Sequence, residues 1–540
     1  MKRTLSALLI AAFFIAALVL LVKHQETVAN AAPAFKGVLT WHNDNLRTGR
    51  NTSESTLTLK NVNAATFGKL FTLTTDGLVD AEPLYVPNLT IGGTSHNVLF
   101  VVSENDTVYA FDADNGSPLW QVTALVGSEV ASDNRGCGQV TPKIGITSTP
   151  VIDPSSGPHG TIYLIAMSKD SSGSYHQRLH ALDITTGDEQ FAGPVDIAAK
   201  YPGTGDNSQN GFVVFDPKQY KERAALLLIG HTIYTSWASH CDFRPYTGWI
   251  ISYDETTLAQ QAVLNVTPNG NEGAIWAAGS GLAADSQGNI YFDDANGTFD
   301  TSLDPNGFPV NGDYGNAIVK LSTKKKKLAV ADYFNMYNTV AESNSDEDLG
   351  SGGAMVLPNI KDSSGGVHQL VVGAGKDANI YLADRTNMGK FNASNNSQLY
   401  QELSGALGGS VFSAPAFSQN QIFYGSVNDN IKAFAFNSSA KLNSTPQSKT
   451  TTSFGYPGAT PSISGNTKKD TILWATENTS PAVLHAYNAN DLAVELYNSN
   501  QASGGRDHFG NGNKYITPTI ANGKVYVGTQ TGVGVFGLLQ

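Results

Sequence analysis

Beyond residue 68, apolar and β-branched residues form short runs that are separated by turn residues. Clear examples are Asn97–Val102, Thr107–Asp112 and Thr161–Ala166, which lie close to Gly, Asn, Asp or Ser. Apolar residues that recur at every third or fourth position, the mark of an amphipathic helix, are almost absent. The pattern therefore predicts an all-β protein.

The runs belong to one supersecondary unit that recurs along the chain. Its clearest copy comprises Glu82–Val86, Asn97–Val102 and Thr107–Trp120, and the next begins with Thr149–Asp153 and Thr161–Ala166. A repeat of roughly 45–65 residues with four short strands has the size of a β-propeller blade. Copies begin near residues 76, 146, 210, 273, 348, 408, 454 and 515. We therefore expect a single eight-bladed β-propeller of four-stranded antiparallel blades over residues 68–540.

The two ends of the repeat region predict how this ring closes. Phe67–Leu73 is an extra strand upstream of the first full copy, and the last copy reaches Gln540 after three strands. Pairing the N- and C-terminal segments would complete the last blade and remove exposed sheet edges, which otherwise invite aggregation. Residues 32–67 then form a lead-in segment.

The N-terminus has the pattern of an export signal. Lys2 and Arg3 precede a charge-free apolar run over Leu5–Val22, and Ala29-Asn30-Ala31 has the small residues of a cleavage site. The sequence predicts a signal peptide over residues 1–31, cleaved after Ala31. Because the apolar run is long for a signal peptide, the alternative is an uncleaved membrane anchor. In both cases the remainder is exported, to be secreted, periplasmic or displayed at the cell surface.

Charge and cysteine content narrow the function classes. Asp and Glu outnumber Lys and Arg by 46 to 34, and the only basic run, Lys324–Lys327, is short. Nucleic acid is therefore excluded as the main partner, because phosphate binding needs clustered cations. Cys137 and Cys241 are the only cysteines, and we expect one disulfide in an exported protein. No Cys-x-x-Cys-His motif for a covalently attached haem occurs, so no haem is expected.

Several segments carry a resemblance to a known family. Ala110–Trp120 looks like a tryptophan-docking motif, and Trp41–Leu59 looks like an N-terminal lead-in. Gly375–Lys390, and Asn296-Gly-Thr with Gly312–Asn316 downstream, resemble site-bearing segments. Together they resemble the quinoprotein alcohol dehydrogenases, which depend on pyrroloquinoline quinone (PQQ). The resemblance implies PQQ and Ca²⁺ as cofactors, an alcohol or sugar as substrate, and an external electron acceptor.

The resemblance also implies roles for individual residues around the metal and the substrate. Asp313 falls where the family has the base that removes the substrate hydroxyl proton, and Asn296 falls on a Ca²⁺ ligand. The family's Glu ligand has no clean match, and Asp242 is the nearest acid. Ca²⁺ binds several oxygen ligands and acts as a Lewis acid, while a carboxylate can serve as the base. The alternative for Asp313 and Asn296 is a plain turn role, because both lie beside Gly.

Three further positions correspond to residues that contact the quinone. Lys376 falls on the cation that hydrogen-bonds the quinone carbonyl oxygens, where it would stabilise developing negative charge. Asp80 falls where the family has a Glu that touches the cofactor. Arg135 corresponds to an Arg that binds a cofactor carboxylate. The alternatives are a rim charge for Lys376, a strand start for Asp80 and a loop residue for Arg135.

The chain departs from the family pattern at the quinone-stacking positions. The family's pair of adjacent cysteines is absent, and only Cys137 lies near the equivalent point. Gly279 and Gly281 occupy the stretch where a stacking Trp is expected, and Trp276 lies slightly upstream. The acidic cluster Asp346–Asp348 is interpreted as a solvated loop rather than a metal site.

Two functions therefore remain as hypotheses. The first is an exported quinoprotein dehydrogenase that oxidises an alcohol or sugar hydroxyl. The second is a non-catalytic propeller that binds a glycan, a peptide or a cell-envelope partner through its loops, because one fold hosts many functions. The dehydrogenase hypothesis requires that the side chains at positions 80, 135, 296, 313 and 376 converge on one funnel and that an aromatic face covers it. The binding-module hypothesis does not require this.

Overall fold

Nearly all regular secondary structure in the protein is β-strand. The structure, a computed structural model, describes residues 37–539, so the predicted signal peptide lies outside the described residues. Within this range α2 (Thr339–Asn344) is the one α-helix, and no helix has the length and apolar character needed to cross a membrane. The prediction of an all-β fold is confirmed.

Eight sheets of the described region each contain a set of four strands in which every neighbouring pair is antiparallel. Five of these sheets consist of the set alone, and the other three carry one or two additional short strands. The first four sets are β3 (Leu84–Ile91), β4 (Thr94–Val102), β5 (Thr107–Asp112) and β6 (Pro118–Thr123); β9 (Val151–Asp153), β10 (Thr161–Lys169), β11 (Tyr175–Asp183) and β12 (Val195–Asp196); β17 (Leu227–Ile229), β18 (Thr232–Ser236), β20 (Trp249–Asp254) and β21 (Gln260–Asn265); and β22 (Ala283–Ala284), β23 (Ile290–Asp293), β24 (Ala317–Ser322) and β25 (Ala329–Asn335).

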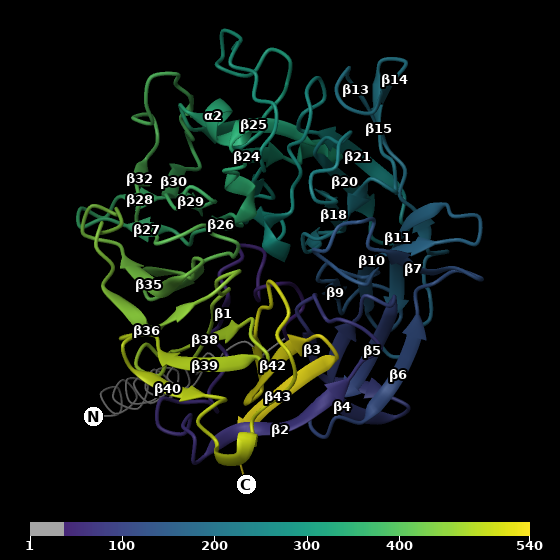
Figure 1. Ribbon diagram of the computed structural model, residues 1–540, viewed down its shortest axis with the longest axis vertical. Helices are drawn as coiled ribbons and strands as arrows, with labels where there is room; N and C mark the ends of the chain where they lie inside the picture. The colour runs from purple at the N-terminus through teal and green to yellow at the C-terminus, as the bar shows by residue number, and fades with distance from the viewer. Residues whose placement is uncertain (1–36, 540) are drawn as a thin grey trace, which may run out of the picture. The chain divides into compact units, whose positions relative to one another are not determined.

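The other four sets complete the series. They are β26 (Met355–Val356), β29 (Leu370–Gly373), β30 (Ile380–Asp384) and β32 (Gln401–Leu403); β33 (Ala416–Ser418), β34 (Gln421–Tyr424), β35 (Asp429–Ala435) and β36 (Ser448–Phe454); β37 (Ser462–Ser464), β38 (Ile472–Glu477), β39 (Val483–Asn488) and β40 (Glu495–Asn498); and β41 (Thr519–Ala521), β42 (Lys524–Thr529), β43 (Gly532–Leu538) and β2 (Phe67–Thr74). Within residues 37–539 the sheets follow one another in chain order around a common centre (Figure 1).

Short strands and turns connect or extend these sheets. The strands are β1 (Arg50–Asn51), β7 (Val130–Asp133), β8 (Lys143–Ile144), β13 (Lys200–Pro202), β14 (Ser208–Gln209), β15 (Phe212–Val214), β16 (Tyr220–Lys221), β19 (Ala238–Ser239), β27 (Ile360–Lys361), β28 (Val367–His368) and β31 (Lys390–Phe391). The 3-10 turns are η1 (Ala277–Gly279), η2 (Lys324–Lys326), η3 (Leu349–Ser351) and η4 (Ser503–Gly505).

The apolar cores lie between consecutive sheets. One core joins Met355 and Leu382 of one sheet to Ile422 and Phe434 of the next. A strand covered on both faces needs apolar residues throughout, and β10 is buried along almost its whole length. The fourth strand of a set, such as β6, is largely exposed. Burial therefore decreases from the middle strands of a sheet to its last strand.

Trp120 joins the first sheet to the second. Its indole Nε1 donates a hydrogen bond to the Ile184 carbonyl oxygen (3.1 Å), and its ring covers Gly187. Gly187 has a φ of +79°, and a Cβ there would lie 3.0 Å from the indole ring, so the position favours glycine. The contact is of the tryptophan-docking kind to which the Ala110–Trp120 segment is similar.

The first and last long strands of the described region pair with each other. β2 lies antiparallel to β43, with Phe67 opposite Leu538 and Thr74 opposite Gly532. In Figure 1 the purple β2 accordingly runs beside the yellow β43.

A segment upstream of β2 ties the sheets together. Its backbone contacts reach the first strands of successive sheets, namely Val38 with Tyr85, Leu39 with Ile152, Leu46 with Val356, Thr48 with Phe417 and Arg50 with Ile463. Arg47 is fully buried and donates hydrogen bonds to the carbonyl oxygens of Leu226 (3.1 Å) and Leu282 (2.8 Å). Residues 38–51 therefore act as a common strap for sheets that are far apart in sequence.

Candidate functional site

A cavity of about 360 Å³ opens where loops from several sheets meet, and we call it the central cavity. Its wall combines cations, carboxylates and aromatic rings. The lining residues are Gln139, Lys221, Arg223, Ala238, Ser239, Cys241, Asp242, Trp276, Asp346, Asp348, Lys376, Phe412, Tyr456 and Tyr515. A concave site with apolar walls and a few convergent polar groups is the usual form of a small-molecule site.

The aromatic part of the wall is a connected set of rings. Trp276 lies 6.0 Å from Tyr515 and 5.9 Å from Phe412, measured between ring centroids. The hydroxyl groups of Tyr456 and Tyr515 share a hydrogen bond of 2.9 Å, which fixes their orientation. Aromatic faces of this kind suit a flat ligand. Trp276 thus supplies an aromatic face to the cavity, although it lies upstream of the expected position.

Two buried cations, Lys221 and Arg223, line the cavity. They are 3% and 4% exposed, and the Arg223 guanidinium lies 4.8 Å from the Tyr515 ring centroid. Arg223 Nη2 has no hydrogen-bond partner in the described structure, and no described residue hydrogen-bonds the Lys221 ammonium. Burial, assisted by the positive charge of Arg223, lowers the pKa of Lys221 to about 7. Buried cations without partners are unfavourable, so this arrangement favours an anionic ligand.

Two carboxyl groups lie next to these cations. Asp80 Oδ1 is 3.9 Å from Arg223 Nη1. Burial and the charge of Asp80 raise the pKa of Glu104 well above its ordinary value. Glu104 Oε2 accepts hydrogen bonds from the Gly145 amide (2.7 Å) and the Thr147 hydroxyl (3.1 Å). In the described structure neither carboxyl group lies within hydrogen-bond distance of the Arg223 guanidinium.

The acidic side of the cavity is built around Asp348, which is 3% exposed. Its Oδ2 accepts a hydrogen bond from Trp276 Nε1 (3.3 Å), and its Oδ1 lies 3.6 Å from Lys376 Nζ. Burial raises the pKa of Asp348 to about 7, against the opposing charge of Lys376 and with the support of Asp346. A carboxylate with this pKa is suited to general base chemistry near neutral pH. The interpretation of this acidic cluster as a solvated loop is wrong for Asp348, because the surrounding loops bury it.

A second cavity of about 630 Å³ adjoins the central cavity, and Asp242 and Asp346 line both. Asn296 lines this side cavity and is 8% exposed. Several residues that line the side cavity have left-handed backbone conformations, with φ of 53° at Asp242, 62° at Glu272 and 58° at Asp346. Strained backbone of this kind clusters at ligand sites in proteins.

Calcium does not fit the carboxylates at this site. In the described region no group of three or more His, Cys, Asp or Glu residues has the arrangement of a metal site. Asp346 Oδ1 lies 2.6 Å from Lys376 Nζ, and Asp242 Oδ1 accepts hydrogen bonds from Ser239 and Tyr246, each 2.9 Å. Ca²⁺ needs six to eight oxygen ligands. Asn296 and Asp242 share the side cavity but offer no such shell.

Asp313 and Arg135 do not line the central cavity. Asp313 is buried, and its Oδ1 accepts a hydrogen bond from the Asn269 amide (2.9 Å). Burial raises the pKa of Asp313 to about 6. Arg135 donates from Nε to the Lys218 carbonyl oxygen (2.9 Å) and lies over the Tyr175 ring. Of the five side chains taken from the resemblance, Lys376 lines the central cavity and Asn296 lines the side cavity. Asp80 lies 3.9 Å from Arg223, which lines the central cavity.

The two cysteines form a disulfide that reaches the central cavity. Cys137 and Cys241 are 104 residues apart in sequence, and their Cα atoms are 5.7 Å apart. Cys241 lines the cavity, so the disulfide fixes one part of its wall. By constraining the unfolded chain, a cross-link of this span stabilises the fold.

The sequence reasoning missed Lys221, Arg223 and Asp348. A usable signal exists for the first two, because Lys221-Glu222-Arg223 precedes the apolar residues Ala224–Leu226 without a turn residue between them. A charged run that leads directly into a buried segment is atypical of a solvated loop.

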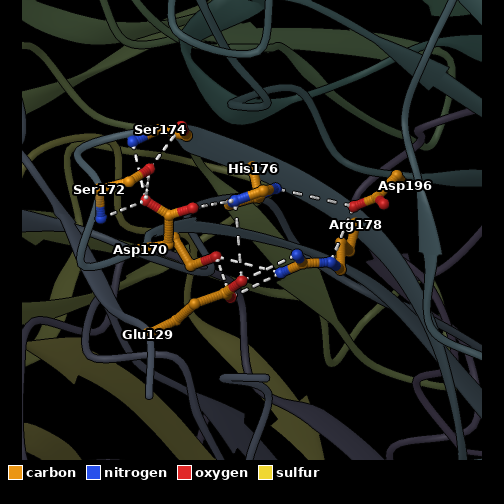
Figure 2. Close-up of polar contacts among 8 residues, drawn as sticks. Glu129, Asp170, Ser172, Ser174, His176, Arg178 and Asp196 are labelled. Carbon is orange, nitrogen blue, oxygen red and sulfur yellow. Dashed lines mark hydrogen bonds and ion pairs between the residues drawn. The ribbon is translucent and has the colours of Figure 1, made fainter. Parts of the chain in front are cut away.

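A second group of charges lies on an outer part of the second sheet (Figure 2). We call it the outer charge network, and it comprises Glu129, Asp170, His176, Arg178 and Asp196. Arg178 donates to both carboxylate oxygens of Glu129 (2.6 and 2.8 Å) and lies 2.8 Å from Asp196, and His176 lies 3.3 Å from Asp170. Burial acts to raise the pKa of Glu129, but hydrogen bonds from Arg178 and Ser168 outweigh it and the pKa is lowered. Because these charges have protein partners, the network is structural.

Comparison with known proteins identifies the fold. No protein-family model matches the sequence, and a search of curated proteins finds no match. Among solved structures, quinohemoprotein alcohol dehydrogenase from Comamonas testosteroni aligns with a TM-score of 0.60 and 14% identity, covering 94% of this chain and 81% of that chain. Quinohemoprotein alcohol dehydrogenase ADHIIG from Pseudomonas putida HK5 aligns with a TM-score of 0.59 and 12% identity, covering 93% and 80%. The chain shares their fold. At these identities the likeness concerns the fold alone, so the activity must be argued from the cavity.

Proposed function

We propose that the protein is an exported, quinone-dependent dehydrogenase built on an eight-bladed β-propeller. The eight sets of four antiparallel strands support the number of blades, and the pairing of β2 with β43 supports closure of the ring. The N-terminal sequence and the Cys137–Cys241 disulfide support export. The substrate is an alcohol or sugar hydroxyl, and an external acceptor receives the electrons.

One observation carries the proposal: buried cations without hydrogen-bond partners lie beside aromatic rings in a cavity. PQQ is a planar aromatic tricarboxylate, so its chemistry matches this wall. Arg223 and Lys221 would pair with its carboxylates, and the aromatic wall formed by Trp276, Tyr515 and Phe412 would lie beside its ring system. When bound, the quinone supplies the two-electron acceptor that an alcohol oxidation needs.

Asp348 is the candidate base. A carboxylate must take the hydroxyl proton as the carbinol carbon is oxidised, and Asp348 is buried within the cavity wall with Oδ1 free of hydrogen bonds. The Trp276 indole holds its other oxygen, which orients the carboxyl group. Lys376, 3.6 Å away, stabilises the ionised form that accepts the proton. This assignment replaces Asp313, whose carboxylate faces the Asn269 amide instead.

The test is reconstitution with the quinone. The purified protein is incubated with PQQ, in parallel with and without CaCl₂, freed of unbound PQQ by gel filtration, and assayed for bound quinone by absorbance and for dye reduction over a panel of alcohols and sugars. We expect retained quinone and dye reduction with at least one hydroxyl substrate. Protein that retains no quinone and reduces no dye contradicts the proposal and leaves a non-catalytic propeller that binds a glycan, a peptide or an envelope partner.

A further inference from the structure

We propose that the central cavity binds its anionic quinone through Lys221, Arg223 and Lys376 alone and requires no metal ion. This inference rests on the proposed function and states how the site would hold the quinone. The occupant is a planar aromatic polycarboxylate, and three ammonium or guanidinium groups supply the positive charge around it.

The carboxylates of the cavity are not available as a metal shell. Lys376 Nζ lies 2.6 Å from Asp346 Oδ1 and 3.6 Å from Asp348 Oδ1, so an ammonium group already occupies the space between these acids. Asp242 is held by the hydroxyl groups of Ser239 and Tyr246. A divalent cation would have to displace Lys376 and still find several more oxygen ligands.

The cations are placed where a ligand can use them. Lys221 and Arg223 lie on one side of the cavity, and Lys376 lies beside the acids on another. Arg223 keeps Nη2 free, and no described residue hydrogen-bonds Lys221, so both retain donors for carboxylate oxygens. A fixed cation beside a quinone oxygen stabilises negative charge that develops there. A Lewis-acid metal stabilises such charge in the same way.

The nearby acids do not supply hydrogen-bond partners for these cations. Glu104 Oε2 is held by the Gly145 amide and the Thr147 hydroxyl, and Asp80 lies 3.9 Å from the guanidinium, beyond hydrogen-bond distance. In the described structure neither carboxyl group hydrogen-bonds Lys221 or Arg223. An anion that binds here would pair with these two buried cations. This pairing would offset the free-energy cost of burying them and so favour binding without a metal ion.

The experiment measures ligand affinity by isothermal titration calorimetry with the full-length protein. The probes are PQQ and benzene-1,3,5-tricarboxylate, a redox-inert aromatic anion, each titrated in excess EDTA and in millimolar CaCl₂. A separate titration with CaCl₂ alone asks whether the protein binds the ion. Variants are Lys221→Met, Arg223→Gln and Arg223→Lys, with Lys361→Met, an exposed lysine on β27, as the matched control. Thermal unfolding checks that each variant is folded.

We expect the affinity for PQQ to agree within about twofold between EDTA and CaCl₂, and CaCl₂ alone to give no saturable binding. Arg223→Gln and Lys221→Met should weaken both probes by about tenfold or more, as expected for the loss of a buried charge pair. Arg223→Lys should retain part of the affinity, and Lys361→Met should retain all of it.

The outcomes separate this inference from the proposed function. Binding of PQQ that needs Ca²⁺, or that strengthens about tenfold or more with it, overturns the metal-free site and leaves the dehydrogenase proposal intact. Metal-free binding of the tricarboxylate without any binding of PQQ overturns the quinone function and leaves a metal-free anion site. Failure of both probes in every arm overturns both proposals.

Discussion

The central cavity and the outer charge network both contain buried arginines near carboxylates. They differ in how many hydrogen bonds and ion pairs the arginine makes. In the outer charge network Arg178 is held by Glu129 and Asp196, with three contacts of 2.6 to 2.8 Å. In the central cavity Arg223 has one carboxylate contact of 3.9 Å and an unpartnered Nη2. Both arginines are buried. A buried charge with complete partners stabilises the fold, whereas one that lacks them and lines a cavity can be paired by a bound ligand.

The pKa shifts of the two regions differ in the same way. Hydrogen bonds lower the pKa of Glu129 in the outer charge network. In the central cavity burial dominates, raising the pKa of Asp348 and lowering that of Lys221, each to about 7. Two groups that change protonation near neutral pH therefore line the central cavity, an arrangement that is common at functional sites.

The largest expected effect comes from removing the candidate base. Asp348→Asn should lower kcat/KM of the PQQ-loaded protein by about 100- to 10,000-fold, the range for a general base, because an amide cannot accept the proton. The measurement is initial-rate dye reduction. Asp188→Asn, at an exposed carboxylate without side-chain partners, is the matched control and should leave the rate unchanged. If Asp313→Asn abolishes activity and Asp348→Asn does not, the base is Asp313, as the sequence predicted.

The second prediction contrasts the stability effects of two buried cations. Arg178→Met should lower the free energy of unfolding by about 3 kcal/mol, because it leaves Glu129 buried without its partner. Lys221→Met should leave that free energy unchanged or raise it by about 1 kcal/mol, because the ammonium has no hydrogen bond to lose. Urea unfolding of the ligand-free protein measures both. Equal destabilisation by the two substitutions would contradict the view that Arg178 stabilises the fold through its ion pairs whereas Lys221 does not.

The third prediction concerns stabilisation by the ligand. PQQ at about 100 times its Kd should raise the free energy of unfolding by about 2.7 kcal/mol, because the quinone binds the folded state only. Arg178→Met should gain the same increment from its lower baseline, since its defect lies outside the cavity. Arg223→Gln should gain little at the same PQQ concentration. Thermal unfolding with and without PQQ tests this, and a loss of the increment in Arg178→Met would show that the two regions are coupled.

The smallest effect is a pH dependence. Because the base must be ionised, kcat/KM should fall about tenfold per pH unit below about 7 and level off above it, with Lys376 and Asp346 as the flanking charges. Glu129 has a lowered pKa, so its stabilising contribution is present above its unfolded pKa and is lost only at lower pH. Between pH 6 and 8, kcat/KM should therefore change with pH. Over the same range, urea unfolding should show that the contribution of the outer charge network to the free energy of unfolding stays constant.

Much of the fold could be predicted from local pattern. The Thr107–Asp112 run is β5 over the same residues, and the strand at Phe67 is β2. Such strands are visible because apolar runs and turn residues alternate over short distances. The strap over residues 38–51 could not be predicted, because its partners, such as the Leu282 carbonyl oxygen bonded by Arg47, are distant in sequence.

The candidate site could be predicted only in part. Lys376 was found through the resemblance and lines the cavity. Asp348 and Arg223 were missed because their neighbours in sequence are also charged, and charged runs are usually solvated. Their burial arises from sheets that meet around a common centre, which is a tertiary effect that no local pattern reveals.

We infer that the two cations of the central cavity that no described residue hydrogen-bonds, Lys221 and Arg223, mark the quinone site. A crystal structure of the protein grown with saturating PQQ tests it most directly. We expect quinone density in the central cavity beside Trp276 and Tyr515, with carboxylate oxygens within hydrogen-bond distance of Arg223 and Lys221 and no metal density beside them. A cavity that stays empty at saturating PQQ, or a quinone bound elsewhere on the protein, would contradict it.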